Sequence, residues 1–236
     1  MIQNACLVSQ SSKISMEMLK AAAVAYNIHM TRDFKPIWGR STNVVTAPNL
    51  RAVPRGYWPV VWVDRMDHPG ALGYHASQHN QPISFCLATD EWDITGCHEL
   101  DEMTVDPFGN RLSLVRSMPY SSDLVQFLIE TDDPIEAQNY KIGDIRCSNF
   151  LTPEYYDEEA TEGQKYDFLG TLKAPRTLIE GGYVSYVFED GTWGQTTFFD
   201  GDTPSSRTLL ARPEKHQPLR NFIDQQTLAY KASLSK

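Results

Sequence analysis

The residues with the clearest chemical potential lie in one short segment, CHELDEM, at positions 97–103. His98 and Glu102 are four residues apart. On an α-helix, which repeats every 3.6 residues, both side chains therefore point to the same side. An imidazole and a carboxylate on one helix face can bind a metal ion such as zinc. Glu99 lies beside them, where it can act as general base on metal-bound water.

The spacing differs from the H-E-x-x-H motif of zinc peptidases because Glu102 stands in place of the second histidine. Carboxylates bind zinc, but acidic ligands also suit calcium, which remains the alternative metal. On a helical wheel, Cys97, Leu100 and Thr104 fall opposite His98 and Glu102, so we expect a buried back and a polar front. An exposed helix with ordinary acidic residues is the competing interpretation.

Two further acids follow an apolar stretch, in the sequence FLIETDDP. Glu130 and Asp133 could project from the end of a strand toward the helix, and either could be the third metal ligand. In the competing interpretation, Asp133 forms a turn before Pro134 and Glu130 lies in solvent. The sequence leaves both readings open.

Two more polar residues are candidates for supporting roles. Asp106 is one further helical turn from Glu102, too far for the same ion on a straight helix, so we expect it to cap the following turn or support the site. His75 ends a predicted strand and is either a ligand, an oxyanion donor or a packed structural histidine. The remaining histidines have no partner pattern and stay unassigned: His29, His68, His79 and His216.

The elements that must position these residues follow from periodicity and breakers. The H-E-x-x-E segment is predicted to lie on a helix over 91–105, ended by Asp106-Pro107 and Gly109. A first helix is expected over 13–32, with Ser12 or Ser15 as its N-cap. Strands are predicted at 3–8, 44–45, 58–64, 71–77, 83–89, 124–131, 183–190 and 194–199, and a last helix at 217–234.

A backing helix, several strands and then the metal-binding helix is the element order of the upper half of a zincin. In that fold an edge strand, here 71–77 or 83–89, pairs with an extended peptide substrate. We therefore predict an α+β, zincin-like domain with a mixed twisted sheet and an irregular C-terminal half. The single domain would span 1–236, with an upper half at 1–110 and a lower half at 111–236. The acidic stretch 152–165 is expected to be a solvated loop.

Composition excludes several classes of protein. The 236 residues carry 21 Lys and Arg against 30 Asp and Glu, a formal charge of −9, so a nucleic-acid partner would lack its main electrostatic attraction. The sequence shows no apolar stretch long enough for a membrane span, and its start is not typical of a secretion signal. Four cysteines without a C-x-x-C pair are expected to be reduced thiols: Cys6, Cys86, Cys97 and Cys147.

Several segments together resemble a set of phage, prophage and bacterial proteins with an SHELLEMLADP helix and a VEVCDP strand end. The segments of this chain that carry the resemblance are GALGYH, HELDEMTVDPFGNR, FLIETDDPIEAQNYKIGDIRCSNFLTPEYYD and YDFLGTLKAPRTLIEGGY. The resemblance runs in order from about residue 19 to the C-terminal helix. The pattern matches His75, His98, Glu99, Glu102, Asp106, Glu130 and Asp133, with Cys97 in place of a serine. The resemblance implies at most a proposed metallopeptidase, and a phage origin implies association with the virion.

Two functions from different classes fit these observations. The first is a zinc-dependent metallopeptidase for a peptide or protein substrate, with metal ligands His98, Glu102 and one of Glu130 and Asp133. Glu99 would be the general base, and His75 would stabilise the oxyanion. The second is a non-enzymatic virion protein that keeps the scaffold, binds a stabilising ion such as calcium and contacts neighbouring virion proteins. The expected location is the host cytoplasm or the phage virion.

Overall fold

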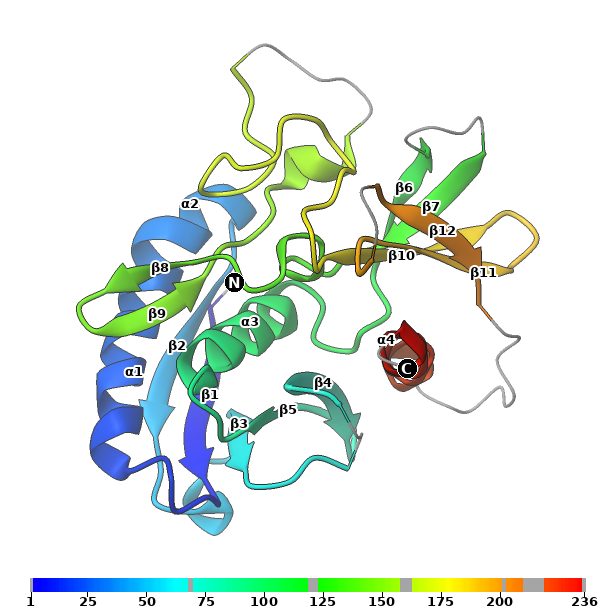
Figure 1. Ribbon diagram of the computed structural model, residues 1–236. Coiled ribbons are helices and arrows are strands. Elements are labelled where there is room, and N and C mark those ends of the chain that lie inside the picture. Colours follow the sequence, from blue (N-terminus) through cyan, green and yellow to red (C-terminus); the bar gives the residue numbers. More distant parts are fainter. Residues whose placement is uncertain are drawn as a thin grey trace. The chain divides into compact units, whose positions relative to one another are not determined.

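The computed structural model of the chain describes residues 2–67, 70–118, 123–157, 163–200, 203–209 and 219–234 (Figure 1). The chain divides into two compact units. The first comprises Met1–Phe108 and Asn139–Ser148, and the second comprises Gly109–Gln138 and Asn149–Lys236. The first boundary lies close to the predicted division after residue 110. The segment 139–148, which the sequence assigned to the lower half, instead belongs to the first unit, and a single domain over 1–236 stays a prediction.

The first unit contains a five-stranded mixed sheet in the order β2-β1-β3-β5-β4. Three of its four strand pairings are parallel, and the fourth, between β5 and the edge strand β4, is antiparallel. The elements of this unit are β1 (Ile2–Ser9), α1 (Met16–Ile28), η1 (His29–Phe34), α2 (Lys35–Trp38), β2 (Ser41–Thr46), η2 (Leu50–Ala52), β3 (Trp58–Val63), β4 (Gly73–Gln78), β5 (Gln81–Leu87), α3 (Trp92–Val105), β8 (Asn139–Ile142) and β9 (Ile145–Ser148). The predicted strands at 3–8, 58–64, 71–77 and 83–89 correspond to β1, β3, β4 and β5.

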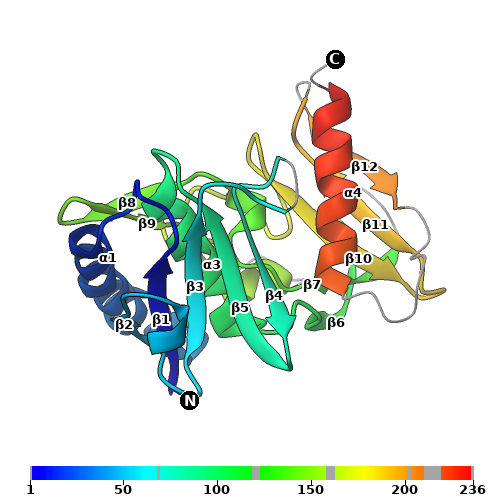
Figure 2. The same ribbon diagram turned by 90° about the horizontal axis from the view of Figure 1, so that it is seen from below.

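Helices α1 and α3 lie against the same face of this sheet (Figure 2). The Tyr26 hydroxyl of α1 donates a hydrogen bond to the Asp93 carbonyl of α3 at 2.6 Å, and the Trp62 indole of β3 donates to the Trp92 carbonyl at 3.0 Å. A Cβ at Gly96 would come within 2.2 Å of the Trp62 ring, so the glycine allows α3 to pack closely on β3. These contacts fix the position of α3.

The first helix begins later than predicted and continues beyond the predicted end. Ser15 is the N-cap, because its hydroxyl accepts a hydrogen bond from the Met18 backbone N–H at 3.2 Å. After Ile28 the chain continues as a π-helical turn, η1, and then as the short helix α2. A π-helical turn within a helical run is often found at a functional position.

A tight turn joins β4 to β5. His79 and Asn80 have φ values of 52° and 60°, the left-handed pair that a two-residue hairpin turn requires. The turn aligns His75 of β4 opposite Ser84 of β5. His75 is thereby held in a paired strand at the edge of the sheet.

The second unit contains an antiparallel sheet in the order β12-β11-β10-β7-β6. Helix α4 (Leu219–Leu234) packs against it, with Phe222 and Ile223 next to Leu128 and Leu209. The other elements are β6 (Leu112–Ser117), β7 (Leu124–Leu128), η3 (Asp133–Ile135), η4 (Pro153–Tyr156), β10 (Tyr183–Phe188), β11 (Trp193–Thr197) and β12 (Ser205–Thr208).

The predicted irregular C-terminal half is therefore wrong, because the second unit has a regular sheet. Strands β6 and β12 gave little signal in the sequence because apolar side chains such as Leu114 and Val115 are exposed. The coarser prediction of a mixed α+β protein is confirmed. His68, His216, residues 158–162 of the predicted acidic loop and residues 217–218 of the predicted last helix lie outside the described residues. Within the described ranges, no helix combines the length and the apolar character that a membrane crossing requires.

Candidate functional site

The predicted helix is present as α3, and it is far more buried than the wheel suggested. Glu99 and Glu102 are 2% and 0% exposed, and every residue of α3 except His98 is buried. The interpretation of an exposed helix with ordinary acidic residues is therefore wrong. The prediction that Cys97 faces the core is confirmed, because its side chain is fully buried. Burying two carboxylates without compensating partners would be costly, so their surroundings decide what the site can do.

His75 of β4 faces both carboxylates. Its Nδ1 atom is 3.5 Å from Glu99 Oε2 and 3.5 Å from Glu102 Oε2. Its Nε2 atom lies 3.1 Å from the Asp106 carbonyl oxygen, which can only accept, so Nε2 carries the proton. The Nδ1 atom of a neutral His75 then presents its lone pair to the two carboxylates. A cation bound here would have one imidazole nitrogen and two carboxylates nearby, of which Glu102 can be a ligand and Glu99 can accept a proton from bound water.

Glu102 is shared by two histidines. Its Oε2 atom faces His75, and its Oε1 atom is 3.3 Å from His98 Nε2. The His98 side chain is 13% exposed, whereas Glu102 is fully buried. The structure thus brings four of the predicted site residues together: His75, His98, Glu99 and Glu102.

Asp106 acts on the site through its backbone. Its N–H donates to the Glu102 carbonyl oxygen at 2.7 Å and ends α3, while its own carbonyl accepts from His75. The following Pro107 disfavours a helical conformation at Asp106. The expected supporting role of Asp106 thus has a structural basis, because the residue links the end of α3 to β4.

Gly73 at the start of β4 makes room for Glu99, a role that was not predicted from the sequence. A Cβ at Gly73 would lie 2.4 Å from Glu99 Oε1 and 2.7 Å from Thr95 Cγ2. A glycine inside a predicted strand is the signal that could have pointed to it, because such glycines often mark a close approach.

The donor atoms fit a transition metal better than calcium. One ligand atom from each of His75, Glu99 and Glu102 lies within 4.8 Å of the others. Zinc accepts imidazole and carboxylate together in sites with three or four ligands. Calcium prefers six to eight oxygen atoms, which this imidazole-containing group does not supply.

No family model, curated protein or solved structure matches the chain. The resemblance to the phage-associated proteins therefore stays a prediction. Function has to be inferred from the side chains of the site and from their geometry.

The predicted third ligands belong to the second unit, where both contact an arginine. Arg220 Nη1 lies 2.9 Å from Glu130 Oε1 and 3.1 Å from Asp133 Oδ2. Its Nε atom lies 2.9 Å from Asp224 Oδ1. Burial alone would lower the pKa of Arg220, but the three carboxylates outweigh it and raise that pKa. The competing interpretation is wrong in placing Glu130 in solvent, because Glu130 is 4% exposed, but Asp133 does begin the turn η3 before Pro134. A ligand role for either acid stays a prediction.

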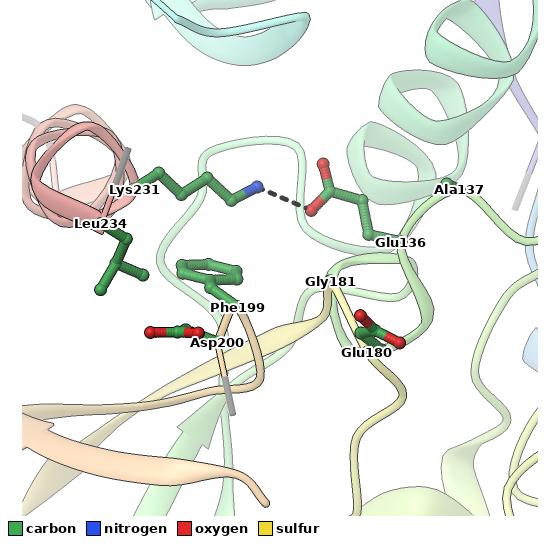
Figure 3. Close-up of a pocket in the computed structure, with 8 residues that line it drawn as sticks. All are labelled: Glu136, Ala137, Glu180, Gly181, Phe199, Asp200, Lys231 and Leu234. Carbon is green, nitrogen blue, oxygen red and sulfur yellow. Dashed lines mark hydrogen bonds and ion pairs between the residues drawn. The ribbon is translucent and has the colours of Figure 1, made fainter. Parts of the chain in front are cut away.

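The second unit also has a pocket of about 480 Å³ between α4 and the segments around Glu136 and Gly181 (Figure 3). Lys231 of α4 reaches across it, with Nζ 2.9 Å from Glu136 Oε2 and 4.6 Å from the centre of the Phe199 ring. Glu180 and Asp200 also line this pocket. The Lys231 ammonium group thus already has Glu136 as its partner. None of the predicted site residues lines this pocket.

Proposed function

We propose that the chain is a zinc-dependent peptidase of a zincin-like type, with α3 as its metal-binding helix. The observation that carries the proposal is the burial of Glu99 and Glu102 against His75, with His98 on the accessible side of Glu102. Deep burial of two carboxylates beside imidazole nitrogens is typical of a metal site.

Each residue has a defined role in this proposal. A zinc ion held by His98 and Glu102 would lower the pKa of a bound water and polarise the peptide carbonyl. Glu99, whose Oε2 atom faces the cluster, accepts the proton of the attacking water. His75 lies between the two carboxylates, since its Nδ1 atom is equally far from each. The third ligand is one of Glu130 and Asp133 or His75 itself, and oxyanion stabilisation by His75 stays a prediction.

The substrate class follows from the edge of the sheet. Strand β4 is the outer strand beside β5, and it carries His75. The outer strand of a sheet can offer backbone N–H and C=O groups to an extended peptide. A peptide added to β4 would run beside the residues of the cluster, which supports a peptide or protein substrate.

Two matched substitutions on α3 test this function. Glu99→Gln should retain zinc but lower the cleavage rate of an unstructured peptide about 10²–10⁴-fold, because it removes the general base. Glu102→Gln should lower zinc content, because a neutral amide is a poorer ligand than a carboxylate. Glu91→Gln, the same change at an exposed residue next to α3, is the control and should leave both unchanged.

Zinc content is measured by elemental analysis and cleavage by mass spectrometry, on the same preparations. A wild-type protein that holds no zinc after reconstitution would contradict the proposal. So would a Glu99→Gln variant that cleaves as fast as the wild type, because the motif would then lack its base.

A virion structural protein that keeps this scaffold and an ion site is the second candidate. It is favoured by the partnership of Glu130 and Asp133 with Arg220, since acids held by a guanidinium contribute to structure without catalysis. This function predicts metal-dependent stability without peptide cleavage. Stoichiometric metal together with no cleavage of a broad peptide library would favour it.

A further inference from the structure

A second group of potential ligands lies on the other side of α3. It consists of His29 at the start of η1, Cys97 of α3 and Cys147 of β9, and all three are fully buried. One ligand atom from each residue lies within 4.8 Å of the others. The two thiols are in hydrogen-bonding contact, and all four cysteines of the chain are free.

His29 is oriented as metal-binding histidines commonly are. Its Nε2 atom lies 2.8 Å from Asp101 Oδ1, and both side chains are fully buried. A carboxylate on one ring nitrogen fixes the ring plane and directs the other nitrogen toward a possible metal ion. That other nitrogen, Nδ1, lies 2.7 Å from the Tyr140 hydroxyl oxygen.

Tyr140 lies near the two thiols as well as His29. Burial raises the pKa of Tyr140, and the hydrogen bond to Asp33 and the nearby Cys97 and Cys147 sulfurs raise it further. The Tyr140 hydroxyl donates to Asp33 Oδ2 at 2.6 Å. Its oxygen therefore accepts a hydrogen bond from His29 Nδ1, which carries a proton while no metal is bound.

We propose that His29, Cys97 and Cys147 form a binding site for a thiophilic d¹⁰ metal ion, Zn²⁺ or Cu⁺. On binding, the two thiol protons and the Nδ1 proton of His29 leave to solvent, and each sulfur becomes a thiolate ligand. The Nδ1 atom of neutral His29 is then the third donor, and the Tyr140 oxygen, which loses its hydrogen bond from Nδ1, lies beside it. For Zn²⁺ the two thiolates balance the charge of the ion, which makes burial in this core acceptable.

The site joins elements that are distant in the sequence. Cys147 belongs to the hairpin β8–β9, the segment through which the chain returns to the first unit after residue 138. The hairpin is only two short strands, a size that is marginally stable by itself. A metal ion would attach it to α1 and α3, so its role is structural and independent of the proposed peptidase activity.

Cadmium titration of the full, reduced chain tests the proposal. The wild type should develop a thiolate-to-metal charge-transfer absorption that saturates at one thiolate-bound cadmium ion per chain. Cadmium should also raise the melting temperature. Cys97→Ser and Cys147→Ser should each lose at least half of this absorption and bind cadmium at least tenfold more weakly. The absorption should persist in Cys86→Ser, which removes a thiol equally buried but close to Glu99, and in His98→Ala.

Several outcomes would overturn the proposal. A thiol reagent in denaturant first confirms that all four cysteines of the sample are reduced. If the folded wild type from that sample shows no absorption with cadmium, the proposed site is contradicted. Equal absorption in Cys97→Ser, or its loss in Cys86→Ser, would assign the thiolate elsewhere. If a serine variant does not fold, the cadmium NMR shift of the wild type decides, because two sulfur ligands and an all-oxygen or nitrogen set give clearly different shifts.

Discussion

Both units bury acidic side chains deeply, but they give them different basic partners. In the first unit, Glu99 and Glu102 face the imidazoles of His75 and His98. In the second unit, Glu130, Asp133 and Asp224 surround the guanidinium of Arg220, which is 4% exposed. The acids are equally buried in the two clusters, so the chemical difference lies in the base.

Imidazole and guanidinium offer different chemistry to a buried carboxylate. A guanidinium is charged at every working pH and has no lone pair, so Arg220 can position acids but cannot bind a metal. A neutral imidazole has a lone pair, and a metal ion can take the place between it and a carboxylate. The comparison favours the proposed metal binding at the histidine cluster and a structural role for the arginine cluster.

The largest effect is expected at the arginine. Arg220→Met keeps most of the side-chain volume but leaves three buried carboxylates without their cation. The free energy of unfolding should fall by about 3–5 kcal/mol, as when one partner of a buried ion pair is removed. Urea unfolding measures it, with the exposed Arg55→Met as control. A loss below about 1 kcal/mol would show that the cluster is not a structural ion pair.

Zinc should stabilise the histidine cluster in a way the arginine cluster cannot match. At zinc concentrations 100-fold above Kd, ligand binding adds about 2.7 kcal/mol to the free energy of unfolding. His98→Ala should abolish this gain, because it removes the nitrogen ligand on α3. Chelator-treated and zinc-loaded samples are compared by urea unfolding, and a gain that survives in His98→Ala contradicts the assignment.

Asp133→Asn extends the same measurement to the third ligand. A reduced zinc response in this variant would support Asp133 as a ligand, as its sequence position suggests. An unchanged response would leave the third position to Glu130 or His75, and would confine Asp133 to its ion pair with Arg220.

The local part of this picture could be predicted from the sequence, and the long-range part could not. Helix α3 was predicted because His98, Glu99 and Glu102 lie within one stretch ended by a proline. The Asp101–His29 pair joins residues 72 positions apart, and no local pattern signals it. Arg220 was missed for the same reason, since it lies 87 positions after Asp133.

Two fold errors have physical causes as well. The hairpin at 139–148 was placed in the lower half because chain order suggested it, whereas packing against α1 and α3 returns it to the first unit. The wheel predicted a polar front for α3 but not its burial, because acids usually face solvent. Here His75 of β4 covers that front, and a wheel contains no information about a neighbouring strand.

Gly73→Ala tests how closely β4 approaches α3 in the histidine cluster. The added methyl group would lie 2.4 Å from Glu99 Oε1, so the carboxylate has to move. We expect the free energy of unfolding to fall by about 1–3 kcal/mol, the usual cost of overpacking. The cost should shrink in a Glu99→Ala background, where the space is open, and a double-mutant cycle measures this coupling. Additive effects would show that Glu99 is not the group displaced.

The smallest effect is expected at Lys231, the other cation of α4 that binds an acid in the second unit. Its ammonium group pairs with Glu136 and lies over Phe199, but the two charged side chains are 35% and 28% exposed. Such a pair contributes about 1 kcal/mol or less, because solvent screens it. Lys231→Met should therefore cost far less stability than Arg220→Met on the same helix.

In 1 M salt, where the screening length is about 3 Å, the cost of Lys231→Met should fall further, while that of Arg220→Met stays nearly constant. Urea unfolding of both variants at low and high salt measures the contrast. Equal salt dependence would mean that Arg220 is as accessible to solvent as Lys231, and the distinction between a buried and a surface cation would fail.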